Sequence, residues 1–123
     1  MGVKFDRTQE VIKEVERVSR ACLTEIGITG KADLMANCPV HKIKPGEKYR
    51  GVPGTLRKGH HYRTDFDDKT KRVIFANSVY YAPYVEFKAK GKGGNPWFRA
   101  TLREDREKFL KIVKKHLAKV EGV

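Results

Sequence analysis

The sequence contains few cysteines, no long apolar run and comparatively few acidic residues, and each shortage excludes a class of protein. Its two cysteines, Cys22 and Cys38, do not form a CxxC pair, so we expect neither a disulfide scaffold nor a cysteine-based zinc site. No stretch approaches the roughly 18 apolar residues that a membrane-spanning helix needs. The first residues also lack the apolar centre of a signal peptide. We therefore expect a protein that is made in the cytosol and has no membrane partner.

Basic residues outnumber acidic ones by 27 to 15, which gives a formal net charge of +12. The excess is uneven along the chain. Residues 1–37 carry six basic and six acidic side chains, residues 38–72 carry ten and four, and residues 88–119 carry eleven and three. Such an excess is typical of contact with a polyanion, most often nucleic acid. A charged surface that only keeps the protein soluble is the alternative.

The chain length of 123 residues favours one domain, residues 1–123. Apolar residues recur every three or four positions over residues 7–26, which predicts an amphipathic helix. Helical composition resumes after Gly27 and Gly30, so residues 7–36 are predicted as one kinked helix or two. Residues 41–54 combine prolines, glycines and basic residues without periodicity, which predicts an exposed basic loop.

Residues 55–66 and 71–77 predict two strands joined by residues 67–70, with Val73 and Phe75 on one face and Ile74 on the other. Residues 79–87 are aromatic and β-branched and predict a third strand, with Pro83 at an edge or a bulge. The antiparallel strands therefore span residues 55–87. Residues 88–98 are a Gly/Lys loop followed by an apolar anchor. The sequence TLRE from Thr101 fits a capping box, which predicts a C-terminal helix over residues 101–120.

Together these elements predict an α+β fold. It has an N-terminal amphipathic helix, a small antiparallel sheet of three to four strands, and a C-terminal helix packed on the sheet.

No group of residues in the sequence is typical of an active site. His60 and His61 are adjacent, so on a strand they point to opposite faces and cannot serve one centre. The cluster Asp65, Asp67 and Asp68 is followed by basic residues instead of calcium ligands, so a hairpin turn explains it better. No serine, threonine or cysteine lies in a nucleophile-elbow context. We expect no catalytic residue, no metal and no cofactor, and hence not an enzyme.

Three fragments, taken in order, resemble one known family. They are residues 36–40 (ANCPV) completed by 53–58 (PGTLRK), residues 79–87 (VYYAPYVEF), and residues 96–100 (PWFRA) before the last helix. Together they are similar to the neck and tail-completion proteins of tailed bacteriophages. The chain departs from the family pattern in its extra residues 41–52, in the order Gly54-Thr55, and at Lys88 and Thr101, where the family commonly has glycine and proline.

The resemblance implies a structural protein of the virion, at the neck or the top of the tail, that joins the DNA-filled head to the tail. It implies assembly in the host bacterial cytoplasm, a homo-oligomeric ring, neighbouring connector and tail proteins as partners, and non-specific contact with genomic DNA. The residues that carry the motif or are candidate interface residues are Tyr81, Ala82, Pro83, Tyr84, Val85, Glu86, Phe87, Pro96, Trp97, Phe98 and Arg99. The candidate contacts with DNA in the lumen or with an acidic partner are Lys42, Lys44, Lys48, Arg50, Lys88, Lys90 and Lys92.

A second hypothesis remains open from the residues alone. The same basic composition fits a small nucleic-acid-binding protein, either a regulator or a nuclease-like toxin. Aromatic residues beside lysines, as at Tyr84, Phe87 and Lys88, can stack on bases in single-strand binders, although burial in a core explains part of this cluster as well.

Overall fold

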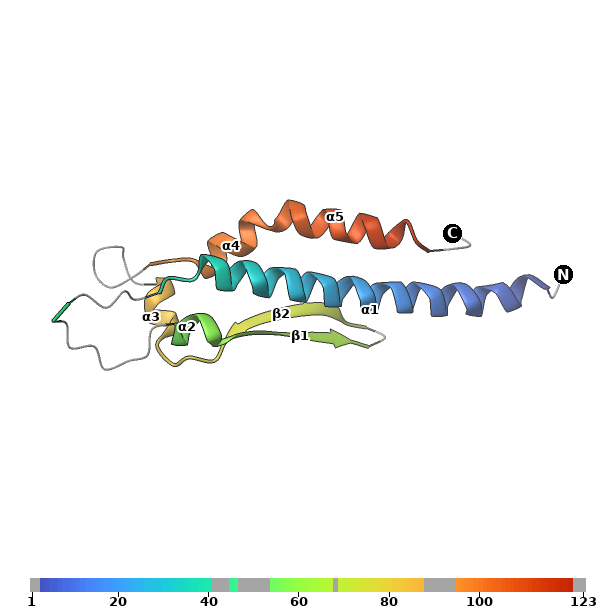
Figure 1. The fold of residues 1–123 in the computed structure, drawn as a ribbon. Coiled ribbons are helices and arrows are strands. Elements are labelled where there is room, and N and C mark those ends of the chain that lie inside the picture. Colours follow the sequence, from blue (N-terminus) through green and yellow to red (C-terminus); the bar gives the residue numbers. More distant parts are fainter. Residues whose placement is uncertain (1–2, 41–44, 47–53, 68, 88–94, 121–123) are drawn as a thin grey trace.

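Helix α1 (Val3–Asn37) is the central element of the fold. The computed structural model describes residues 3–40, 45–46, 54–67, 69–87 and 95–120, with side chains from residue 8 onward. A β-hairpin lies along one side of α1 and the C-terminal helices lie along the other (Figure 1). The predicted helix over residues 7–36 is confirmed, and it is one helix that continues through both glycines.

The two glycines of α1 stand where the helix approaches the hairpin most closely. A β-carbon at Gly27 would overlap the ring of Tyr62, and one at Gly30 would overlap the ring of Phe75. Glycine inside a helix costs roughly 0.5–1 kcal/mol relative to alanine. Here that cost is offset because the absent side chains allow two aromatic rings to lie against the helix backbone.

The hairpin consists of β1 (His60–Phe66) and β2 (Lys71–Asn77), paired antiparallel from His60↔Asn77 to Phe66↔Lys71. The turn between them is stabilised by Asp67, whose Oδ1 accepts hydrogen bonds from the backbone N–H groups of Lys69 and Thr70. The predicted second strand and turn are therefore confirmed. The first strand begins later than predicted, because residues 55–58 form a short helix, α2 (Thr55–Lys58), after Gly54 with φ of 87°.

The predicted third strand is wrong. Within the described residues the sheet has two strands, and the segment YAPYVEF contains a helix, α3 (Ala82–Phe87). Pro83 lies in the first turn of α3, where its missing N–H has no helical partner to lose. Both strand and helix geometry place Tyr81 and Val85 on one face, so the apolar pattern did not distinguish the two.

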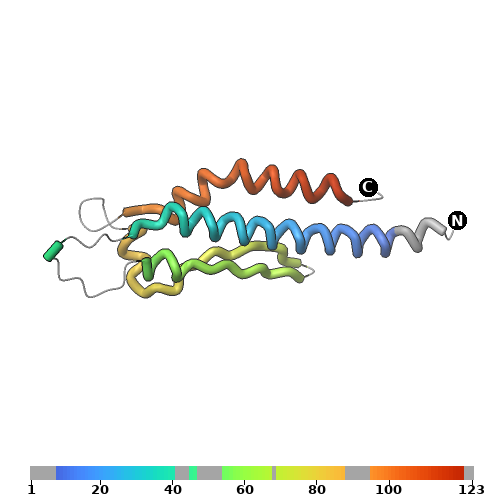
Figure 2. Tube along the Cα trace, viewed as in Figure 1, coloured from blue at the N-terminus to red at the C-terminus, as the bar shows by residue number. Residues whose placement is uncertain are grey.

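The predicted C-terminal helix over residues 101–120 consists of two helices, α4 (Phe98–Glu104) and α5 (Arg106–Leu117). Thr101 is not a cap, because α4 begins before it and its hydroxyl accepts a hydrogen bond from the Asn37 side chain. The prediction that this helix packs on the sheet is also wrong. Helix α5 packs on α1, opposite the hairpin (Figure 2). Its Phe109 also stacks on Phe75 of β2.

The buried core lies near the carboxyl end of α1. It consists of Leu34, Cys38, Leu56, Ala82 and Trp97. The amino end of α1 extends past both the hairpin and α5 (Figure 1). In the part of the chain that the structure describes, no helix combines the length and apolar character that a membrane crossing requires. The fold therefore has a packed end, which contains α2, α3 and α4, and a projecting helical end.

Candidate functional site

The packed end is organised around the carboxylate of Glu86, which α3 buries to 5% exposure. Its Oε1 accepts hydrogen bonds from the backbone N–H groups of Trp97 and Phe98, at 2.8 and 2.9 Å. Its Oε2 accepts from the backbone N–H and the side-chain Nε of Arg99, at 3.0 and 2.9 Å. These N–H groups belong to the start of α4 and have no partner within that helix. Glu86 therefore fixes α3 to the beginning of α4.

Burial by itself raises the pKa of Glu86. The hydrogen bonds from Arg99, Phe98 and Trp97 favour the ionised form and outweigh burial, so the pKa of Glu86 is lowered. The helix dipole of α4 acts in the same direction. Glu86 is therefore a carboxylate held ionised for structural reasons, and it has no free oxygen to act as a general base.

Trp97 connects this carboxylate to the hairpin. Its indole Nε1–H donates to Nε2 of His60 at 2.9 Å, and Nδ1 of His60 lies 2.9 Å from the backbone oxygen of Arg57. Because an indole nitrogen only donates, Nε2 must be the acceptor and the proton of the neutral ring is on Nδ1. Burial lowers the pKa of His60. His60 is therefore a buried neutral bridge between α2 and Trp97.

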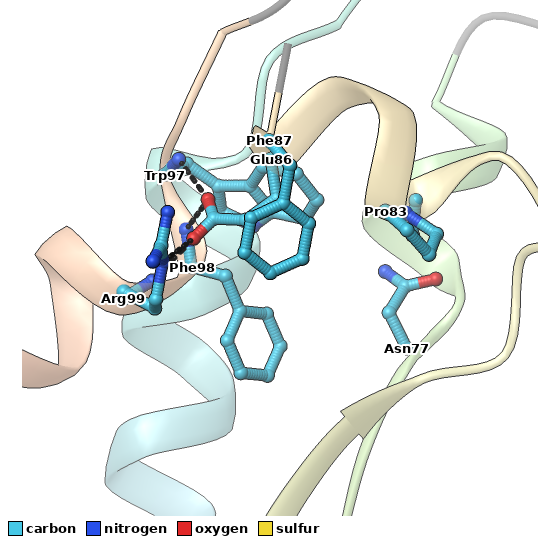
Figure 3. A pocket seen from close by; sticks show the side chains of 8 residues that line it. Asn77, Pro83, Glu86, Phe87, Trp97, Phe98 and Arg99 are labelled. Carbon is cyan, nitrogen blue, oxygen red and sulfur yellow. Dashed lines mark hydrogen bonds and ion pairs between the residues drawn. The ribbon is translucent and has the colours of Figure 1, made fainter.

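A shallow pocket of about 260 Å³ opens beside this network. Phe87 and Phe98 line it together with Pro83 and Asn77, while Arg99 lies at its edge beside Glu86 (Figure 3). The Arg99 guanidinium lies 4.5 Å from the centre of the Phe87 ring. Ligand pockets usually measure roughly 300–1,000 Å³, so this pocket suits one or two side chains better than a cofactor.

A second buried carboxylate, Asp105, lies where α4 meets α5. It faces Asp33 of α1, and Lys108 contacts both of them, Asp33 at 2.7 Å and Asp105 at 3.9 Å. Oδ2 of Asp105 is buried and accepts no hydrogen bond from any described residue. Burial, followed by the hydrogen bond and the charge of Asp33, raises the pKa of Asp105 to about 6. This site holds a proton at mildly acidic pH.

The motif residues of the YAPYVEF and PWFRA segments divide into two groups. Ala82, Glu86 and Trp97 are buried, and Tyr81, Val85 and Phe98 pack against the core. The exposed members are Pro83, Tyr84, Phe87, Pro96 and Arg99. Glu86 and Trp97 thus act within the chain, while the exposed members remain candidates for an interface. The predicted lysine and arginine contacts, Lys42, Lys44, Lys48, Arg50, Lys88, Lys90 and Lys92, lie outside the described residues.

Asp68 lies outside the described residues, and the described residues that could serve a nuclease, His60, Asp65 and Asp67, do not converge. His60 is buried against Trp97, and Asp65 is paired with Arg63 and Arg72 on the hairpin surface. Asp67 closes the turn through its Oδ1. Among the residues that the structure describes, no three His, Cys, Asp or Glu side chains are grouped so that they could hold a metal ion.

The sequence reasoning missed two buried side chains of this region. His60 was placed on a strand without its burial being foreseen, and Asp105 was not singled out at all. The only signal for Asp105 was its position inside a helical apolar stripe, three residues after Leu102. No such signal marks His60, because its burial depends on Trp97, which is 37 residues away.

No protein-family model, curated protein or solved structure matches this chain.

Proposed function

We propose that this chain is a structural protein of the head–tail connector of a tailed bacteriophage, in the neck or tail-completion ring. The proposal rests on the ordered resemblance of three sequence fragments. One observation supports it. Glu86 of YAPYVEF accepts hydrogen bonds from the backbone N–H groups of Trp97, Phe98 and Arg99. The second and third fragments thus contact each other and form one structural unit.

The surface of this unit also supports a role in assembly. Tyr84 and Phe87 of α3 are exposed large side chains, and Tyr80 is exposed just before the helix. Aromatic residues are enriched at the centres of protein interfaces. A segment that places Glu86 and Ala82 in the core and Tyr84 and Phe87 on the surface fits a subunit of an assembly.

The decisive experiment removes the gene from the phage or prophage that carries it and images the particles. We expect full heads and separate tails, and expression of the wild-type chain from a plasmid should restore joined particles. An antibody against the chain should label the head–tail junction of wild-type virions. Normal joined particles in the absence of the gene would contradict the proposal.

Nucleic-acid binding is the second candidate, and one observation favours it. The outward face of α5 carries the exposed residues Arg106, Lys111 and Lys114, which form no ion pair with any described residue. Each such cation near a phosphate releases a counterion.

The two candidates differ in their response to salt. A dedicated binder that contacts six or more phosphates should lose affinity by orders of magnitude between roughly 50 and 200 mM salt. A connector subunit should bind free duplex weakly, even at the low end of that range. Tight, strongly salt-dependent binding together with normal particles in the deletion strain would favour the second candidate.

A further inference from the structure

Helix α5 is attached to α1 by a thin apolar contact. Ile112 and His116 are its buried residues, whereas Leu110 and Leu117 are 44% and 58% exposed. A cavity of about 150 Å³ lies under its second half, between α1, β2 and α5. A cavity beneath a helix reduces the dispersion contacts that hold it, and segments with few buried apolar contacts open at a low cost in free energy. Polar contacts therefore decide how firmly α5 is held.

Asp105 is the residue about which α5 can turn. It is the single residue between α4 and α5, and the two helices run in different directions on either side of it (Figure 1). Helix α4 is fixed independently of α5, because Glu86 accepts hydrogen bonds at its first turn and Thr101 accepts one from Asn37 of α1. A movement of α5 therefore leaves α4 in place and changes the surroundings of Asp105.

The polar contact nearest to this hinge is a pair of carboxyl groups. Asp105 faces Asp33 of α1, and the other charged groups near it are Lys108 of α5 and Glu104 of α4. Oδ2 of Asp105 is buried without a hydrogen-bond partner among the described residues. A proton shared by the two carboxyl groups joins α1 to the hinge, whereas two ionised carboxylates repel each other. The pKa of Asp105, raised to about 6 by burial and by Asp33, places this change at mildly acidic to neutral pH.

The polar contact farther along α5 is also stronger with a proton. Nε2 of His116 lies 3.1 Å from Oε1 of Glu25 on α1, and the two form an ion pair only when the imidazole is protonated. Lys115 lies 2.7 Å from both oxygens of Glu25, while Cys22 of α1 and Lys71 of β2 line the same cavity as His116. Loss of an imidazole proton, which for histidine ordinarily falls between about pH 5 and 8, leaves Glu25 paired with Lys115 alone.

We propose that α5 is a pH-sensitive arm, which is held against α1 at mildly acidic pH and opens away from it about Asp105 as the pH rises. Because the pKa of Asp105 is raised above its ordinary 3.8, its contribution to the closed form is full below that value and is lost as the pH rises through about 6. The pKa of Glu25 is lowered by Lys115 and His116, so its contribution is present above its ordinary 4.5 and is lost on acidification. The arm is therefore held most firmly at about pH 5.

The two native cysteines report separately on opening of the arm and on unfolding of the core. Cys22 is buried in the cavity wall beneath α5, so it becomes reactive when α5 opens. Cys38 is buried with Leu34 and Trp97 in a cluster that contains no residue of α5, so it becomes reactive when the core unfolds. The rate at which dithiodipyridine labels each cysteine is measured by mass spectrometry of its peptide. Each rate is divided by the rate in the urea-unfolded chain at the same pH, because the thiolate fraction changes with pH.

We expect Cys22 to be labelled faster than Cys38 at every pH, because the arm opens while the core stays folded. We also expect the normalised rate of Cys22 to rise about tenfold between pH 5 and pH 8, as a carboxyl group whose pKa falls from about 6 to 3.8 on opening requires.

Two variants and a control locate the protons. The amide of Asp105→Asn is neutral at every pH and can donate a hydrogen bond to Asp33, so most of the rise should disappear. The remainder should disappear when His116→Gln, which does not titrate, is added. Glu107→Gln is the matched control, since it removes an exposed carboxylate two residues along the chain from Asp105, and it should keep the rise of the wild type. Circular dichroism establishes that each variant is folded.

Three outcomes would overturn the proposal. The normalised rates of Cys22 and Cys38 could be equal at every pH, which would mean that only unfolding of the core exposes Cys22. The rate of Cys22 could stay constant between pH 5 and pH 8. Asp105→Asn could keep the rise of the wild type. Hydrogen exchange gives an independent measurement, because peptides of α5 should lose protection at pH 8 while those of α4 keep it.

Discussion

Glu86 and Asp105 are both buried carboxylates near α4, yet their surroundings shift the two pKa values in opposite directions. Glu86 receives three backbone N–H groups and a guanidinium, and its pKa is lowered. Asp105 faces the carboxylate of Asp33 and leaves one oxygen without a donor, and its pKa is raised to about 6. The comparison teaches that burial alone does not decide the charge of a carboxyl group. The number of donors that the fold directs at it does.

The largest effect is expected from Glu86→Gln. The amide keeps the shape but loses the charge, and its NH₂ group cannot accept from the backbone donors of α4. A hydrogen bond to a charged group contributes about 1.5–3 kcal/mol to stability. We therefore expect the free energy of unfolding at pH 7 to fall by about 2–3 kcal/mol. Urea denaturation measures it. Glu16→Gln, an exposed carboxylate on α1, is the control and should change stability by less than about 0.5 kcal/mol.

Asp105→Asn should increase stability, whereas Glu86→Gln decreases it. Ionised Asp105 is unfavourable in the fold, so the stability that its protonated form contributes is full below its ordinary pKa of 3.8 and is lost as pH rises through about 6. The lowered pKa of Asp33 offsets part of this loss. We expect the variant to be more stable than the wild type by about 1–3 kcal/mol at pH 8, and the difference to shrink toward pH 4.

Thermal unfolding of Asp105→Asn and wild type across this pH range gives the comparison directly. Glu86 contributes stability above its ordinary pKa of 4.5, which is lost as pH falls. The Asp105→Asn protein should therefore show only the acid-side loss. A pH profile parallel to that of the wild type would contradict the assignment of the proton to Asp105.

Asp33→Asn should change stability less, because two effects oppose each other. It removes the charge and hydrogen bond of Asp33 that raise the pKa of Asp105, and it breaks the ion pair of Lys108, whose side chain is half exposed. We expect a net change within about 1 kcal/mol. The sharper measurement is NMR titration of the Asp105 carboxyl carbon, whose pKa should move down toward its ordinary value. If it stayed near 6, burial alone would account for the shift.

Arg99→Ala should have the smallest effect. The Arg99 side chain is 61% exposed, and the three backbone donors to Glu86 remain after the change. We expect a loss below about 1 kcal/mol and a small rise in the pKa of Glu86, measured by the acid-side unfolding midpoint. A loss as large as that of Glu86→Gln would show that the guanidinium, and not the backbone, holds the carboxylate ionised.

The parts of the fold that were predicted correctly are those with strong local patterns. The stripe of α1 repeats its apolar residues with a clear period, β2 contains a short run of apolar residues, and Asp67 closes a turn with its own backbone neighbours. The third strand failed because Tyr81 and Val85 share a face in either geometry, and β propensity is strongly context-dependent. The site was predicted in part: Glu86 and Trp97 were singled out, but as interface and anchor residues, without their mutual contact.

The sequence by itself determined the amphipathic stripe of α1, the hairpin turn, the basic composition and the motif segments, because these depend on neighbouring residues or on counting charges. Only the tertiary structure decided that Gly27 and Gly30 admit two aromatic rings, that α5 lies on α1, and that Glu86 meets Trp97 while Asp105 meets Asp33. Those contacts join residues far apart along the chain. Their energies depend on distance and burial in three dimensions, which no local pattern in a single sequence specifies.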